Sequence, residues 1–216
     1  MPNSTSPETT PLKVMCFLDF WNYELTMTSD AMEPGFLTNW YQLPNVLTQE
    51  AGKLLKRDVH YERLFIAGSY DPQSPKDAKL YTWANKVLAH VPGVVVDFSK
   101  RQRRTTGPRC TGPTHCEVKT CPHCSASMLG TQEKGVDTRI VTEMLDTALT
   151  NQCDALVLIS ADKDFIPAVE KLQQKNIKCI HAFFPNTGNE LGKKCWAGFE
   201  LFALREQFRR QVKQSS

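Results

Sequence analysis

Acidic residues follow directly after two of the most apolar segments of the chain. Asp19 ends the run KVMCFLD, and Asp162 and Asp164 follow the run ALVLIS. Asp137 begins another segment, after a stretch rich in Cys, Gly and Pro. If these runs are parallel strands, their carboxyl ends share one edge of a sheet, where ligand chemistry gathers. Mg²⁺ and Mn²⁺ prefer such carboxylate oxygens. A metal held there can activate water and stabilise charge on a phosphoryl group.

Strand-like segments alternate with helix-like segments along the chain, which predicts the scaffold for these acids. The strand-like segments are almost uniformly apolar, as expected for strands covered on both faces. The sequence therefore predicts an α/β fold with three layers, in which helices cover both faces of a mainly parallel sheet. The expected strands are 13–19, 59–67, 94–98, 155–159 and 177–183, and the expected helices are 44–56, 75–88, 137–149, 165–175 and 191–211.

Each of the four acids also has a purely structural explanation. An Asp between a strand and a helix is a favoured N-cap, because its side chain accepts a hydrogen bond from the first helical turn. Asp164 in particular could cap a helix beginning at Phe165. Several acids in register with strand ends are harder to explain by capping alone.

Residues 100–134 lack periodicity and form an insertion with four clustered cysteines. Two of the cysteines form a CxxC pair, which brings two thiolates onto one metal, and four thiolates suit the tetrahedral preference of Zn²⁺. The first pair has an unusually wide spacing, so His115 or His123 could replace one thiolate. Disulfides are the alternative explanation. The expected zinc ligands are Cys110, Cys116, Cys121 and Cys124. The other four cysteines, Cys16, Cys153, Cys179 and Cys195, are expected to be buried thiols.

Positive charge is concentrated in two parts of the chain. The net charge is only +3, yet residues 100–134 hold seven bases against two acids, and residues 193–216 hold six against two. Such a distribution suits a polyanion approaching an acidic metal site, although solvated Lys and Arg side chains would look the same. The candidate nucleic-acid contacts are Lys100, Arg101, Arg103, Arg104 and Arg109.

Three longer motifs occur in a characteristic order. They are CFLDFWNYE, KGVDTRIVTEML and LVLISADKDFIPAVEKL. Together they resemble the NYN domain family (LabA-like) of the PIN-like nuclease superfamily, with a cysteine-rich insertion added. The resemblance implies a PIN-like fold and a metal-dependent ribonuclease. It implies Asp19, Asp137 and Asp162 as metal carboxylates, Asn22 as a polar partner at the catalytic site, and Asp164 and Glu143 as further candidates.

The resulting hypothesis is an Mg²⁺- or Mn²⁺-dependent endonuclease that acts on RNA, with DNA as a possible substrate and Zn²⁺ as a structural ion. The alternative is a non-catalytic nucleic-acid-binding or protein-interaction module with the same fold, since a fold does not fix a function. A haloacid-dehalogenase-type phosphatase would need an Asp where Trp21 stands.

The expected organisation is a disordered leader over 1–11, the NYN domain over 12–211 and a tail over 212–216. The leader lacks the apolar segment of a secretory signal, and the chain lacks an apolar run long enough to span a membrane. A cytoplasmic location is therefore expected.

Overall fold

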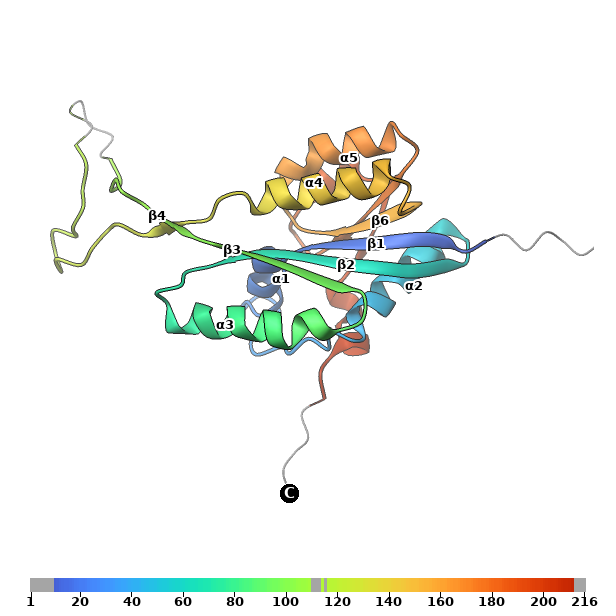
Figure 1. The fold of residues 1–216 in the computed structure, drawn as a ribbon, viewed down its shortest axis with the longest axis horizontal. Coiled ribbons are helices and arrows are strands. Elements are labelled where there is room, and N and C mark those ends of the chain that lie inside the picture. The colour runs from blue at the N-terminus through green and yellow to red at the C-terminus, as the bar shows by residue number, and fades with distance from the viewer. Residues whose placement is uncertain (1–9, 110–113, 115, 212–216) are drawn as a thin grey trace, which may run out of the picture.

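A computed structural model describes residues 10–109, 114 and 116–211. Its centre is a six-stranded sheet in which every paired neighbour is parallel, with the order β3-β2-β1-β6-β7-β8 (Figure 1). Its strands are β1 (Leu12–Asp19), β2 (Val59–Tyr70), β3 (Val94–Lys100), β6 (Ala155–Ile159), β7 (Lys178–Phe183) and β8 (Ala197–Glu200). Residues 1–9 of the expected leader, the expected tail over 212–216 and Cys110 lie outside the described residues.

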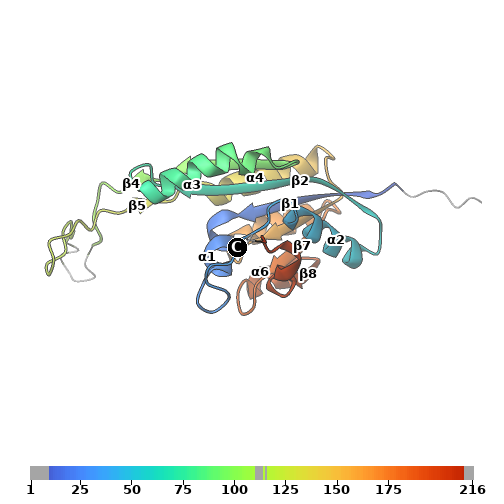
Figure 2. The same ribbon diagram turned by 90° about the horizontal axis from the view of Figure 1, so that it is seen from below.

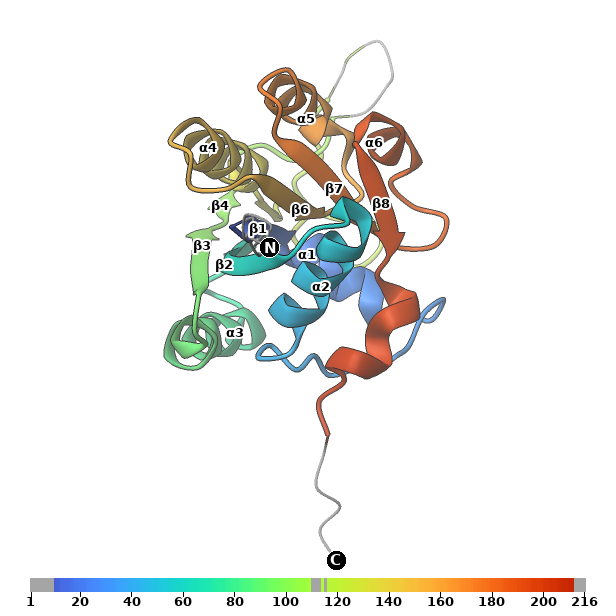
Figure 3. The same ribbon diagram turned by 90° about the vertical axis from the view of Figure 1, so that its right-hand side faces the viewer.

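Helices cover both faces of this sheet, which confirms the three-layer α/β prediction (Figure 3). The helices of one face are α1 (Phe20–Met27), α2 (Leu43–Leu55) and α3 (Pro75–Lys86), and those of the other are α4 (Val136–Leu149), α5 (Ile166–Gln173) and α6 (Asn189–Lys194). Short 3₁₀ segments cover Leu88–His90, Lys163–Phe165 and Phe202–Phe208. None of the helices in the described ranges is long and apolar enough to cross a membrane.

Strand β1 shows why the apolar runs lack alternation. Val14, Cys16 and Leu18 pack into the core beneath α1 and α2. Met15 and Phe17 pack into the second core, beneath α4 and α5. Both faces of the strand are therefore buried between Val14 and Leu18, which explains the uninterrupted apolar run.

The predicted final helix over 191–211 is wrong. Helix α6 ends at Lys194, and the next residues form β8, which pairs with β7. The amide of Leu201 then donates to the carbonyl of Phe183 at 2.8 Å. A Cβ at Gly198 would lie 2.9 Å from the carbonyl oxygen of His181, so this close approach favours glycine. Pairing with the open edge of β7 thus overrides the helical pattern.

The insertion leaves the body as a narrow arm beyond β3 (Figures 1 and 2). Its neck is an antiparallel pair, β4 (Gln102–Arg103) and β5 (Thr131–Gln132). Farther out, a bridge between Thr120 and Ser127 continues the two-stranded character. The arm therefore starts and ends at the carboxyl edge of the sheet.

Candidate metal site and nucleic-acid surface

The predicted acids lie at the point in the sheet where the strand order reverses. The chain proceeds outward from β1 to β2 and β3 on one side, and from β6 to β7 and β8 on the other. Adjacent strands β1 and β6 pair Leu18 with Ile159 at this switch point. Asp19 is the last residue of β1, and Asp162 follows β6 after only two intervening residues. The carboxyl edge at a switch point is the usual ligand site in open α/β sheets.

Hydrogen bonds fix the two strand ends to each other. The side-chain oxygen of Asn22 accepts from the amide of Ala161, and the hydroxyl of Ser160 lies 3.5 Å from a carboxylate oxygen of Asp19. The same Ser160 oxygen accepts from the amide of Asp162 at 3.2 Å. Asn22 and Ser160 thus hold the loop that carries Asp162 against the end of β1.

The acids of this edge act on one another electrostatically. Asp19 is only 8 % exposed, and burial raises its pKa to about 6, while a hydrogen bond from the Asn22 amide opposes the shift. Negative charge on Asp137, Glu133 and Asp162 raises the pKa of Asp19 further. Burial also raises the pKa of Asp137, and so do the charges of three acids: Asp162, Glu133 and Asp164. Asp137 is thus coupled electrostatically to each of the other three predicted aspartates.

Capping and a metal role are compatible for two of these acids. Asp19 Oδ1 accepts from the Asn22 amide at 3.2 Å, and Asp162 Oδ1 accepts from the Asp164 amide at 2.9 Å. Each of these caps uses one carboxylate oxygen, and the other oxygen of Asp19 is approached only by the Ser160 hydroxyl at 3.5 Å. Asp137 lies inside the first turn of α4, behind Gly135, and does not cap that helix. Capping therefore leaves Asp137 unexplained.

A divalent cation would relieve the mutual repulsion of these carboxylates, of which Asp19 is buried, so the donor set fits Mg²⁺ or Mn²⁺. Within the described ranges, no three His, Cys, Asp or Glu side chains converge closely enough to form a ready-made metal site. The acids thus lie within electrostatic range of one another without sharing a coordination sphere. Mg²⁺ commonly takes only one or two carboxylates directly and keeps several waters, which suits this more open arrangement.

Comparison with known proteins identifies the family. The family model described as the NYN domain matches residues 13–199. The chain belongs to the NYN domain family. A crystal structure of a protein of unknown function from Vibrio parahaemolyticus shares the fold, with a TM-score of 0.53 and 18% sequence identity, covering 93% of this chain and 97% of the other. No curated protein matches this sequence.

Glu143, which the motif spacing made a candidate, is engaged elsewhere in this NYN domain. Its carboxylate pairs with the Arg63 guanidinium at 3.1 Å, between α4 and β2. Glu143 is also not among the groups that shift the pKa of Asp19 or Asp137. The structure therefore places it outside the acidic site, with a role in holding α4 on the sheet.

Two of the four predicted zinc ligands form a local unit. The backbone amides of His123 and Cys124 donate to the Cys121 thiol and lower its pKa, which favours the thiolate that zinc binds. Cys116 is exposed nearby in sequence, while Cys110 and His115 lie outside the described residues. The structure neither supports nor completes the predicted zinc site. Cys16, Cys153 and Cys179 are buried in the cores, as predicted, and Cys195 is partly buried.

The two basic regions differ in how their charges are used. Near the C-terminus, Arg205 and Arg209 bind Glu33, with N–O distances of 3.0 and 2.5 Å, and Lys194 binds Glu170 at 2.8 Å. Acids of the domain thus neutralise much of that cluster.

In the arm, Arg103, Arg104 and Lys134 line one polar hollow, and Lys100 and Arg109 are exposed. Among the described residues, the bases of the arm are therefore the more accessible surface for phosphates.

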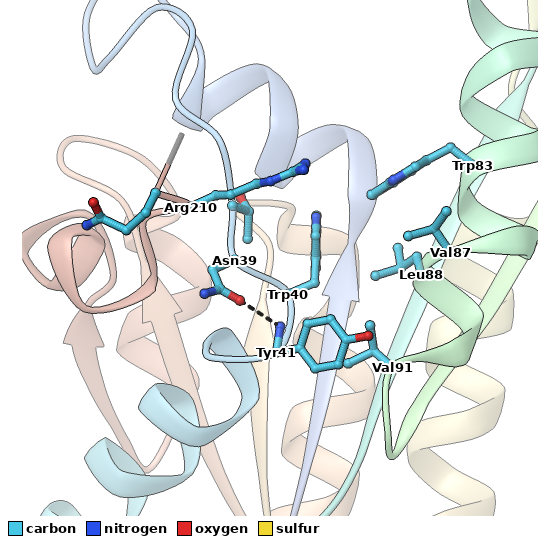
Figure 4. Close-up of a pocket in the computed structure, with 10 residues that line it drawn as sticks. Asn39, Trp40, Tyr41, Trp83, Val87, Leu88, Val91 and Arg210 are labelled. Atoms are coloured by element: carbon cyan, nitrogen blue, oxygen red, sulfur yellow. Dashed lines mark hydrogen bonds between the residues drawn. The ribbon is translucent and has the colours of Figure 1, made fainter. Parts of the chain in front are cut away.

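A further hollow in this NYN domain lies apart from the acids. It is mainly apolar and lies between α3 and the segment before α2 (Figure 4). The residues that line it include Trp40, Tyr41 and Trp83, with Arg210 at one end. No predicted site residue lines it, so the acidic edge remains the candidate for chemistry.

Sequence reasoning missed Glu133 and Ser69. Glu133 stands in the arm and raises the pKa of both Asp19 and Asp137. Its carboxylate accepts a hydrogen bond from the hydroxyl of Ser69, near the end of β2. Glu133 directly precedes the KGVD motif. It was not recognised as a member of the acidic site because the surrounding insertion is otherwise basic.

Proposed function

We propose that this NYN domain is an endonuclease that hydrolyses phosphodiester bonds in RNA with the help of Mg²⁺ or Mn²⁺. One observation carries the proposal: Asp19 and Asp162 stand at the ends of adjacent strands at the switch point, and negative charge on Asp137 and Asp162 raises the pKa of the buried Asp19. Capping accounts for two of these residues but not for Asp137. Family membership supports a nuclease at the level of class.

In this proposal Asp19, Asp137 and Asp162 hold the cation, some of them through its waters. The bound cation supplies an activated water and stabilises negative charge on the phosphoryl group. Asn22 fixes the loop of Asp162, as its bond to Ala161 indicates. Asp164 adds negative charge at the edge and positions Asp162 through its amide.

The arm supplies substrate contacts in the same proposal. Arg103 and Arg104 share a hollow with Lys134, and their charges attract the RNA backbone. We also propose that Zn²⁺ bound by Cys110, Cys116, Cys121 and Cys124 would stiffen the arm. This zinc has a structural role, since the arm surrounds it with bases rather than with an acid that could activate water.

The test is cleavage of a mixed RNA pool by the full chain, with Mg²⁺, with Mn²⁺ and with EDTA, followed by mapping of the product ends. A single-stranded DNA pool is treated in parallel. We expect internal cuts in RNA that require the divalent ion. No cleavage of either pool, combined with tight and metal-independent RNA binding, would instead favour the non-catalytic module, for which the spread of the acids is the supporting observation.

A further inference from the structure

Two residues of opposite charge face each other across the neck of the arm. Arg101 directly precedes β4, and Glu133 directly follows β5. Antiparallel pairing of Gln102 with Gln132 brings them side by side, and a guanidinium nitrogen of Arg101 lies 4.0 Å from the Glu133 carboxylate. The pair therefore marks the point where the arm joins the domain.

Ser69 fastens this pair to the domain. Its hydroxyl is buried, donates to the Glu133 carboxylate and accepts from Arg101 Nε at 3.0 Å. The carbonyl of Ser69 accepts from the indole nitrogen of Trp21 at 2.7 Å, and the Arg101 guanidinium lies 5.2 Å from the centre of the Trp21 ring. Trp21 is two residues beyond Asp19, so the neck is held beside the acidic edge.

The position of Glu133 has an electrostatic consequence. Its charge acts on Asp19 and on Asp137, which come from different elements. Its side chain is 38% exposed, so it can change partner without unfolding the domain. A divalent ion at the edge would attract Glu133, because a carboxylate gains more from a divalent cation than from the singly charged Arg101 guanidinium 4.0 Å away.

We propose that Glu133 is a further carboxylate of the metal site and that Arg101, once Glu133 turns to the cation, binds a phosphate of the RNA. The inference rests on the proposed function and deepens it. In the metal-free protein Glu133 occupies Arg101 and lowers its attraction for RNA. Cation binding and RNA binding at this edge then strengthen each other by the same factor. The arm would thus supply a residue of the metal site as well as phosphate contacts.

The first arm of the test measures Mn²⁺ binding to the full chain by the electron paramagnetic resonance signal of free Mn²⁺. Glu133→Gln should weaken Mn²⁺ binding about tenfold, and Glu133→Asp should recover part of the loss. The matched control is Glu117→Gln, which removes an acid of the same arm that contacts Gly107 and Lys119 instead. Unchanged Mn²⁺ affinity in Glu133→Gln would overturn the inference. Unchanged affinity in Asp19→Asn would instead overturn the proposed metal site itself.

The second arm measures RNA binding in EDTA, where cleavage is absent. Glu133→Gln should bind RNA more tightly than wild type by more than the Glu117→Gln control does. Adding Arg101→Met should remove that excess, because the gain depends on the released guanidinium. If the gain matches the control, or survives without Arg101, then Glu133 does not restrain Arg101 and the inference fails. If Glu133 and Arg101 only stabilise the neck, then Glu133→Gln and the Glu133→Gln, Arg101→Met double variant should both bind RNA more weakly than wild type.

Discussion

The side-chain oxygen of Asn22 accepts a hydrogen bond from the backbone amide of Ala161, at 2.9 Å. This bond joins α1 to the loop after β6 across 139 positions of sequence. The same residue donates its own amide to Asp19. Asn22 therefore links two of the proposed metal carboxylates without belonging to the acidic set.

Asn22→Ala should destabilise the domain by about 1–3 kcal/mol, because the Ala161 amide loses its partner in a partly buried place. Asn22→Asp keeps the acceptor but adds a negative charge beside Asp19, so it should recover stability only at a pH low enough to protonate the carboxylates. Chemical unfolding measures both values, with the exposed Asn45→Ala as the control. Equal stability of Asn22→Ala and wild type would show that the bond contributes nothing.

Asp19→Asn should stabilise the metal-free domain at neutral pH. The pKa of Asp19 rises on folding from its ordinary 3.8 to about 6, so its ionisation favours the unfolded chain. The stability that Asp19 contributes is therefore complete below pH 3.8 and lost as the pH rises through about 6. The gain from Asn should reach up to ~3 kcal/mol above pH 6.

Unfolding in EDTA across this pH window tests the argument for Asp19. The advantage of Asp19→Asn should shrink at low pH. Excess Mg²⁺ should reverse the order of the two proteins, because only the wild type gains from binding the ion. An amide variant that is less stable than wild type at every pH would contradict the burial argument.

Charge reversal of Arg103 and Arg104 should weaken RNA binding and reduce its salt dependence, because fewer counterions are released from the phosphates. The expected loss of slope is about one unit for each contact removed. The control is the double variant Lys53→Glu, Lys175→Glu, which makes the same change of charge outside the arm. These two bases lie near the ends of α2 and α5. The same salt slope in both double variants would mean that the arm is only a solvated surface.

The purified protein should contain about one Zn²⁺ per chain if the four cysteines of the arm bind it. Elemental analysis measures the content, and Cys121→Ser should abolish it. Cys153→Ala, in the buried core, should leave the zinc content unchanged. Absence of zinc, together with disulfides among the four thiols, would reject the zinc hypothesis.

Local signals were sufficient for much of the fold. The run ALVLI gave the bounds of β6 correctly, because polar residues flank a wholly buried strand. The expected helix over 75–88 begins at the right residue, because Ser74 caps α3 and accepts from the Asp77 amide. The C-terminal strand β8 could not be found in this way, because its conformation depends on the open edge of β7.

The acids of the candidate site also differ in whether local sequence could predict their positions. Asp19 and Asp162 were predictable as neighbours, because the ends of adjacent parallel strands must meet. Glu133 was not, since its place depends on the pairing of β4 with β5, two residues each, across a long insertion. Glu143, a weaker candidate implied by the family resemblance, instead pairs with Arg63 between α4 and β2, a contact that motif spacing could not show.

The most direct test of the central claim compares RNA cleavage by wild type, Asp19→Asn and Asp162→Asn at saturating Mg²⁺ and Mn²⁺. The control is Asp146→Asn, an exposed acid on α4. Asn caps a helix about as well as Asp, so the folds should survive. Both site variants should lose at least about 100-fold in cleavage rate, while the control should cleave like wild type. Wild-type cleavage by Asp162→Asn would contradict the assignment of that residue to the metal site.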